Sequence, residues 1–134
     1  MKHNTMLTVA SLLSTLFLTL HITDDIVRGI SKAESSNIAL VVLAVFLYGT
    51  LMLPERRSGH VIMLLIGLLA AAMPVMHMRG AHYGEIAKSP GGFFFVRTLW
   101  ALGGLGGFTV ILSVRGLWDL RRRRPQQAGA TGGS

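Results

Sequence analysis

Cysteine is absent from this chain of 134 residues, and charged residues are scarce, at 14% of the total. The lack of cysteine excludes disulfide bonds, thiolate metal sites and thiol nucleophiles. Acidic residues are especially few, with six aspartates and glutamates against thirteen lysines and arginines. A soluble domain carries charge on about a quarter of its residues, so the low charge argues against an ordinary soluble protein.

Hydrophobic residues are correspondingly abundant. They make up 51% of the chain, and the mean hydropathy is +0.53. These residues fall into four blocks separated by short polar segments. A spanning helix needs about 20 mostly apolar residues to cross a bilayer core. The continuous apolar run at 61–66 lacks the alternation of a transmembrane strand. We therefore predict an all-α integral membrane protein, a four-span transmembrane helix bundle.

The predicted transmembrane domain covers residues 1–120. Its four spans are expected at about 5–22, 38–53, 60–78 and 93–118. The remaining residues, 121–134, are basic and then rich in glycine, alanine and glutamine. Such a composition cannot bury an apolar core, so it predicts a disordered C-terminal tail.

The segment after the first span has the pattern of a new helix start. Thr23 is followed by Asp24 and Asp25, and a capping hydroxyl with acids in the first turn stabilises a helix N-terminus. Apolar residues then recur on one face. We therefore predict a short interfacial helix, lying on the membrane surface after the first span.

Basic residues are distributed unevenly between the two predicted membrane faces. Eight of the thirteen lie on the side of the two termini and five on the other. The positive-inside rule then predicts that the N- and C-termini are cytoplasmic. Four of the eight, Arg121, Arg122, Arg123 and Arg124, are expected to contact anionic lipid head groups. The bilayer thus accounts for the basic charge, and we expect no nucleic-acid partner.

Small residues mark two predicted helix-packing faces. Gly67 and Ala71 lie four apart in the third span, and Gly103 and Gly107 form a GxxxG pair in the fourth. Such pairs let a second backbone approach closely. The neighbour is either another span of this chain or a second copy, and both alternatives remain open. Hydroxyl residues of the first span predict a further packing face: Thr8, Ser11, Thr15 and Thr19.

Histidines and acids gather on the predicted outer face. His21 ends the first span, His77 ends the third, and the pairs His21/Asp25 and His82/Glu85 are four and three residues apart. Each pair shares one face if its segment is helical. Imidazole and carboxylate groups are ligands for zinc and other transition metals, and histidine also passes protons near neutral pH. These five residues are therefore a candidate site for a divalent transition metal, although no spacing matches a signature such as H-E-x-x-H.

Three functions are compatible with this sequence. The simplest is a non-catalytic bundle that self-associates, or packs with a membrane-protein partner, through its glycine-rich fourth helix. The second is metal- or proton-linked membrane transport at the outer histidines and acids. The third is a membrane metalloenzyme acting on a lipid-like substrate. The second and third require that these side chains converge, and Pro74, which should bend the third span, would then help to place His77.

Overall fold

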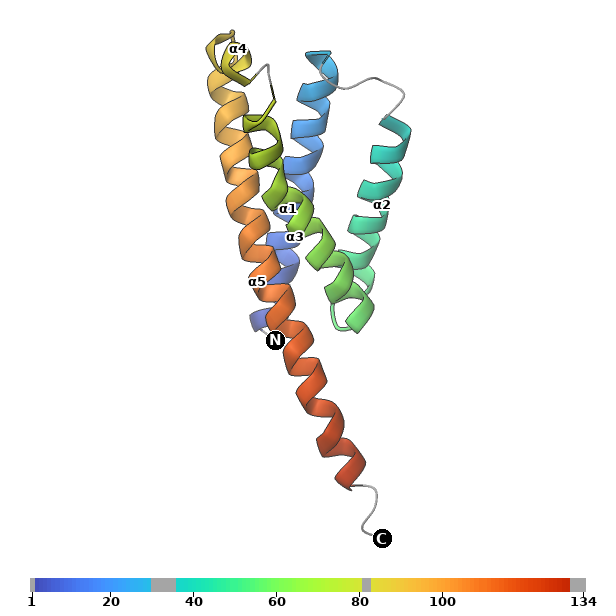
Figure 1. Cartoon of the computed structure of the whole chain (residues 1–134). Helices are drawn as coiled ribbons and strands as arrows, with labels where there is room; N and C mark the ends of the chain where they lie inside the picture. The colour runs from blue at the N-terminus through green and yellow to red at the C-terminus, as the bar shows by residue number, and fades with distance from the viewer. Residues whose placement is uncertain (1, 30–35, 81–82, 131–134) are drawn as a thin grey trace.

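A computed structural model describes residues 2–29, 36–80 and 83–130, and every element within these ranges is a helix (Figure 1). The helices are α1 (Lys2–Val27), α2 (Ser36–Met52), α3 (Arg57–Met78), α4 (Tyr83–Lys88) and α5 (Gly92–Ala130). Three of them, α1, α3 and α5, are long and apolar enough to cross a membrane. Helix α2 has 17 residues, or about 25 Å at 1.5 Å per residue. The all-helical prediction is confirmed, and the three long apolar helices are compatible with an integral membrane protein.

The four longer helices run alternately up and down (Figure 1). We call the end where α1 finishes and α5 begins the upper end, and the end that holds the N-terminus and the α2–α3 turn the lower end. Helices α3 and α5 make the most extensive contact, α1 packs against both, and α2 contacts α1 and α3 from the edge. The upper ends of α1, α3 and α5 are therefore neighbours.

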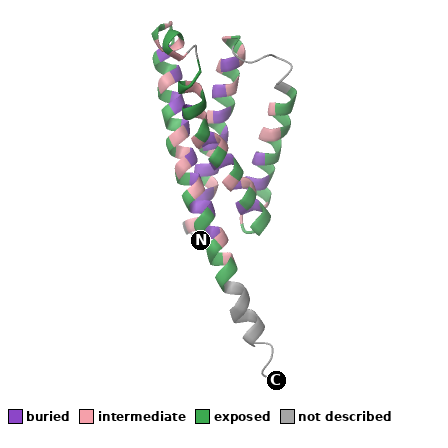
Figure 2. Ribbon diagram, viewed as in Figure 1, coloured by how far each residue is buried: buried purple, intermediate pink, exposed green. Residues whose placement is uncertain are grey.

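The polarity of the outer surface differs from that of a soluble protein. The outward faces are exposed (Figure 2), yet they are apolar. Examples more than half exposed are Leu16, Val41, Leu65 and Ile111. Buried hydroxyls form hydrogen bonds inside the bundle, between Ser11 and Thr50 at 2.8 Å and between Ser14 and Thr109 at 3.2 Å. Lipid suits such an outer surface, and interhelical hydroxyl pairs are typical of membrane bundles.

Helix α1 continues through the predicted helix start at Thr23. The Thr23 hydroxyl donates to the Thr19 carbonyl at 2.8 Å, as hydroxyls inside helices do, and so does not cap a new helix. Asp24 forms an ion pair with Arg28 at 2.7 Å. The helix ends before Gly29, whose φ of 73° suits a C-terminal cap. The predicted interfacial helix therefore does not start at Thr23, and residues 30–35 of that prediction lie outside the described residues.

Glycine lets α3 and α5 approach closely near the middle of the bundle. A Cβ atom added to Gly67 would lie 2.9 Å from the Gly106 carbonyl oxygen, and one added to Gly106 would collide with the backbone at Ala71. Separations under 3 Å leave no room for a side chain. Gly67 and Ala71 thus lie where the third helix meets a neighbour, and the neighbour is α5 of the same chain.

The two members of the predicted GxxxG pair have different surroundings. A Cβ atom on Gly103 would lie 2.6 Å from Cγ of Pro74 on α3, whereas one on Gly107 would meet nothing within 4 Å in the described structure. Gly106, which the GxxxG pattern did not select, occupies the contact instead. Within this chain the α3–α5 contact therefore uses Gly103 and Gly106, while Gly107 faces outward.

The basic segment at the end of the chain is described mainly as a continuation of α5. Helix α5 continues through all four arginines to Ala130, and residues 131–134 lie outside the described part. Arginine is a favourable helix former, so the basic run does not end the helix. Within it, the Arg122 guanidinium lies 5.2 Å from the Trp118 ring centroid.

Candidate metal centre

One face of α1 carries two candidate ligands into the bundle. Residues spaced alternately by four and three positions are all buried: Leu7, Ser11, Ser14, Leu18, His21 and Asp25. This spacing keeps side chains on one helix face, so His21 and Asp25 point inward at the upper end. Thr19, which we expected on the packing face, is exposed. This spacing, which was not among the predicted packing faces, is the signal in the sequence that His21 and Asp25 are buried.

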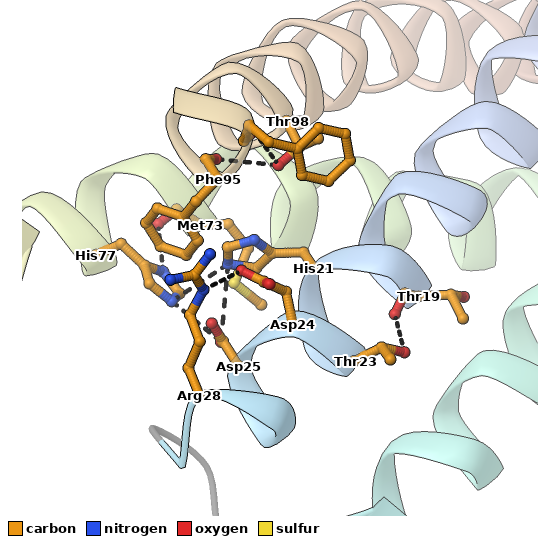
Figure 3. Close-up of polar contacts among 11 residues, drawn as sticks. Thr19, His21, Thr23, Asp24, Asp25, Arg28, Met73, His77, Phe95 and Thr98 are labelled. Atoms are coloured by element: carbon orange, nitrogen blue, oxygen red, sulfur yellow. Dashed lines mark hydrogen bonds and ion pairs between the residues drawn. The ribbon is translucent and has the colours of Figure 1, made fainter. Parts of the chain in front are cut away.

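Helix α3 supplies the third candidate ligand and fixes its orientation. The His77 Nδ1 atom lies 3.0 Å from the Met73 carbonyl oxygen. Because a carbonyl oxygen only accepts, Nδ1 carries the proton, and Nε2 of the neutral ring is left as an acceptor. Such a bond holds a metal-binding histidine in one tautomer and one direction. Figure 3 shows this Nε2 directed toward His21 and Asp25.

Three side-chain atoms converge between α1 and α3. His77 Nε2 lies 3.2 Å from His21 Nε2 and 3.2 Å from Asp25 Oδ2, and His21 Nε2 lies 3.7 Å from Asp25 Oδ2. Zinc–nitrogen bonds of about 2.0–2.1 Å in tetrahedral geometry place ligand atoms about 3.3 Å apart. The observed separations are therefore close to those of three corners of a tetrahedral site.

A cation would stabilise this convergence. In their neutral forms both Nε2 atoms can present lone pairs to each other and to the carboxylate, which repel at this distance. A metal ion between the three atoms, or a proton on one histidine, turns this repulsion into attraction. Two further atoms, His21 Nδ1 and Asp25 Oδ1, are buried without a hydrogen-bond partner among the described residues. The group of side chains therefore has two further polar atoms that could accept or donate a hydrogen bond.

Helix α5 and the end of α1 enclose this site. The Phe95 ring is 1% exposed, and its centroid lies 5.2 Å from the His21 ring and 5.8 Å from the His77 ring. Arg28 lies over Phe95 at 5.8 Å and donates to Ser89 at 3.1 Å. The exposed fraction is 1% for the His21 side chain, 10% for Asp25 and 18% for His77. Access from the surface is thus greatest beside His77.

The structure brings three of the five predicted ligands together. His21, Asp25 and His77 form a group whose ligand atoms all lie within 4.8 Å of one another. Glu85 lies on α4, is exposed and is not in this group. His82 lies outside the described residues. The sequence analysis did not identify Phe95 and Arg28, because neither residue type is a ligand and only the packing of α5 on α1 brings them to the site.

Comparison of the chain with protein-family models, with curated proteins and with solved structures finds no match in any of the three. The function of the site therefore has to be inferred from its own chemistry.

Proposed function

We propose that the chain crosses the membrane four times and that its termini are cytoplasmic. The course of α2 supports a fourth span, because α2 runs alongside α1 and α3 in the opposite chain direction and these two helices are long enough to cross. Its length of about 25 Å is accommodated by local thinning of the bilayer. The excess of arginine and lysine at the lower end supports the orientation. The histidine site then lies at the outer membrane face.

We infer that the function of the bundle is to bind a divalent transition metal, with zinc as the best fit, through His21, Asp25 and His77. The observation that carries this proposal is the convergence of three ligand atoms at 3.2–3.7 Å. The Met73 carbonyl supports it by accepting a hydrogen bond from His77 Nδ1, which leaves Nε2 of the neutral ring as the lone-pair donor that faces the other two ligands. Three protein ligands leave the fourth tetrahedral position open, so the bound ion is exchangeable or reactive.

The core below the site favours metal binding over conduction through the bundle. Leu18, Leu99 and Leu102 are each 0% exposed and lie between the upper histidines and the buried hydroxyl pairs of the lower half. An ion cannot pass such an apolar layer without a rearrangement. Transport would therefore need a second conformation, whereas binding at the outer face needs none.

A lipid-processing metalloenzyme receives less support. Such an enzyme needs a channel for an acyl chain next to the metal. One apolar groove, of about 540 Å³, lies between Thr5–Leu13 of α1 and Leu105–Phe108 of α5, and a second lies at the lower end. Neither borders His21, Asp25 or His77, so neither positions an acyl chain at the site.

Self-association through α5 is a separate proposal. Gly104 and Gly107 face open space, so a helix from a second copy has room to approach there. The inward glycines Gly103 and Gly106 are already in contact with α3, which confines this proposal to the outward face of the helix.

Zinc binding by purified protein tests the proposed metal site. The protein is prepared without a polyhistidine tag, in lipid nanodiscs, and titrated against a chromophoric zinc chelator. We expect one zinc per chain, and a loss of at least about a hundredfold in affinity for His21→Ala and for His77→Ala, since even second-shell changes cost ten- to a hundredfold. His3→Ala, a histidine of the lower end, is the matched control.

The pH dependence of zinc affinity provides a second test of the same site. Metal binding requires neutral imidazole, so zinc affinity should fall as the pH is lowered and the histidines become protonated. Wild-type affinity no higher than that of the His21→Ala/His77→Ala double variant would reject the metal proposal and leave a shared proton as the cation of the site.

A further inference from the structure

A second groove, at the lower end of the bundle, has two chemically distinct parts. It lies between the start of α3 and the later part of α5 and has a volume of about 620 Å³. Its apolar lining consists of Val61, Val114, Leu117 and Trp118. Its charged lining consists of three arginines, Arg57, Arg121 and Arg122. Arg57 comes from a different helix than the other two, so the fold gathers these cations.

The two parts are ordered along the axis of the bundle. On α3, which runs upward, Arg57 precedes Val61 by one turn. On α5, which runs downward, Val114 precedes Arg122 by eight residues, or about 12 Å. Both helices therefore place arginine at the lower end and apolar side chains toward the middle of the bundle.

Charge complementarity identifies the occupant. Neither acid in the flanking turns, Glu55 or Asp119, lines the groove, so three guanidinium groups face it without a carboxylate. Arginine binds phosphate oxygens through paired N–H donors. Trp118, under the Arg122 guanidinium, has the mixed polarity of residues at the lipid head-group level.

We propose that this groove is a binding site for one anionic phospholipid. Its phosphate contacts Arg57, Arg121 and Arg122, and the upper part of one acyl chain lies along Val61, Val114 and Leu117. The site is more specific than general attraction of a basic tail to the membrane surface, because it needs Arg57 and the apolar wall of α3. The groove shares no residue with the metal centre, so the failure of one proposal would leave the other untouched.

Fluorescence of Trp118 provides the test. The chain has two tryptophans, so Trp100→Phe leaves Trp118 as the only one. The full-length variant is reconstituted in phosphatidylcholine vesicles that contain a minor fraction of phosphatidylglycerol, with bromine on the acyl chains of one lipid or the other. Bromine quenches tryptophan at short range, so the extent of quenching reports which lipid occupies the groove.

We expect brominated phosphatidylglycerol to quench Trp118 well beyond its share of the bilayer. Arg57→Gln should lower this preference about fivefold, the effect of one basic residue near a lipid surface. Arg115→Gln is the matched control, because Arg115 is an exposed arginine of α5 that does not line the groove. Arg121→Gln gives a second reading that is independent of the α3 N-terminus.

Three results would overturn the proposal. Equal quenching by the two brominated lipids would show that the groove does not select charge. An equal loss of the preference for phosphatidylglycerol in Arg57→Gln and in Arg115→Gln would show that the preference comes from diffuse electrostatic attraction to the membrane surface. Loss of the preference in millimolar inorganic phosphate, at constant ionic strength, would identify a soluble phosphate as the occupant.

Discussion

Replacement of Asp25 by asparagine distinguishes a metal at the upper site from a shared proton. The side chains have nearly the same shape, but asparagine has no negative charge and offers an N–H donor. The Asp25 side chain is 10% exposed and faces both histidines. The substitution therefore removes one proposed ligand without opening a cavity. It is expected to affect the stability of the apo protein and the stability of the zinc-bound protein differently.

The expected magnitudes follow from the structure. At a free zinc concentration a hundred times its dissociation constant, binding stabilises wild type by about 2.7 kcal/mol, and Asp25→Asn should lose nearly all of this. Without metal at pH 8, where imidazole is ordinarily neutral, the asparagine amide can donate to a histidine Nε2 atom. One such hydrogen bond contributes about 1 kcal/mol, so the apo variant should be as stable as wild type or slightly more stable.

The assay is equilibrium unfolding in mixed detergent micelles at pH 8, with zinc or with a chelator. If the site instead holds a His77 imidazolium paired with Asp25, the substitution breaks a buried ion pair and destabilises the protein by about 3–5 kcal/mol without metal. A destabilised apo variant whose response to zinc matches wild type would refute the metal assignment. Whether Asp25→Asn raises or lowers the free energy of unfolding without metal is thus as informative as the loss of zinc binding.

Three further predictions test the bundle and its orientation. Gly106→Leu should lower the free energy of unfolding by at least about 2 kcal/mol, since overpacking commonly costs 1–3 kcal/mol and backbone atoms of α3 lie opposite Gly106. Gly107→Leu should leave the free energy of unfolding unchanged. Equal effects of the two substitutions in the same unfolding assay would contradict the observed α3–α5 contact. Pro74→Ala should weaken zinc binding about tenfold by reorienting His77, and an unchanged chelator titration would show that the proline does not position the ligand. Lys88→Cys should react with an impermeant thiol reagent outside intact cells and Ser58→Cys only after permeabilisation; the reverse labelling pattern would place the metal site in the cytoplasm.

Local properties of the chain were sufficient for the helical class. The length of each apolar block and the absence of alternation select helices, because a helix satisfies its own backbone hydrogen bonds without a neighbour. The pairing of His21 with Asp25 on one face was likewise predictable, since residues four apart in a helix are always neighbours. The continuation of α1 through Thr23 was not predictable, because a threonine followed by acids is compatible with either a cap or a continuing helix.

Contacts between helices decided which glycines pack and which side chains form the candidate site. Which glycines of α5 meet α3 depends on the rotation of α5 about its axis, and each residue turns that face by about 100°, so Gly106 rather than Gly107 takes the contact. His77 follows Asp25 by 52 residues and His21 by 56, and it reaches them only because α1 and α3 pack with their upper ends together. Phe95 and Arg28 enclose the site for the same reason. Sequence by itself determined which residues have metal-binding chemistry, and only tertiary packing decided which of them share a site, because their distances depend on the placement of whole helices.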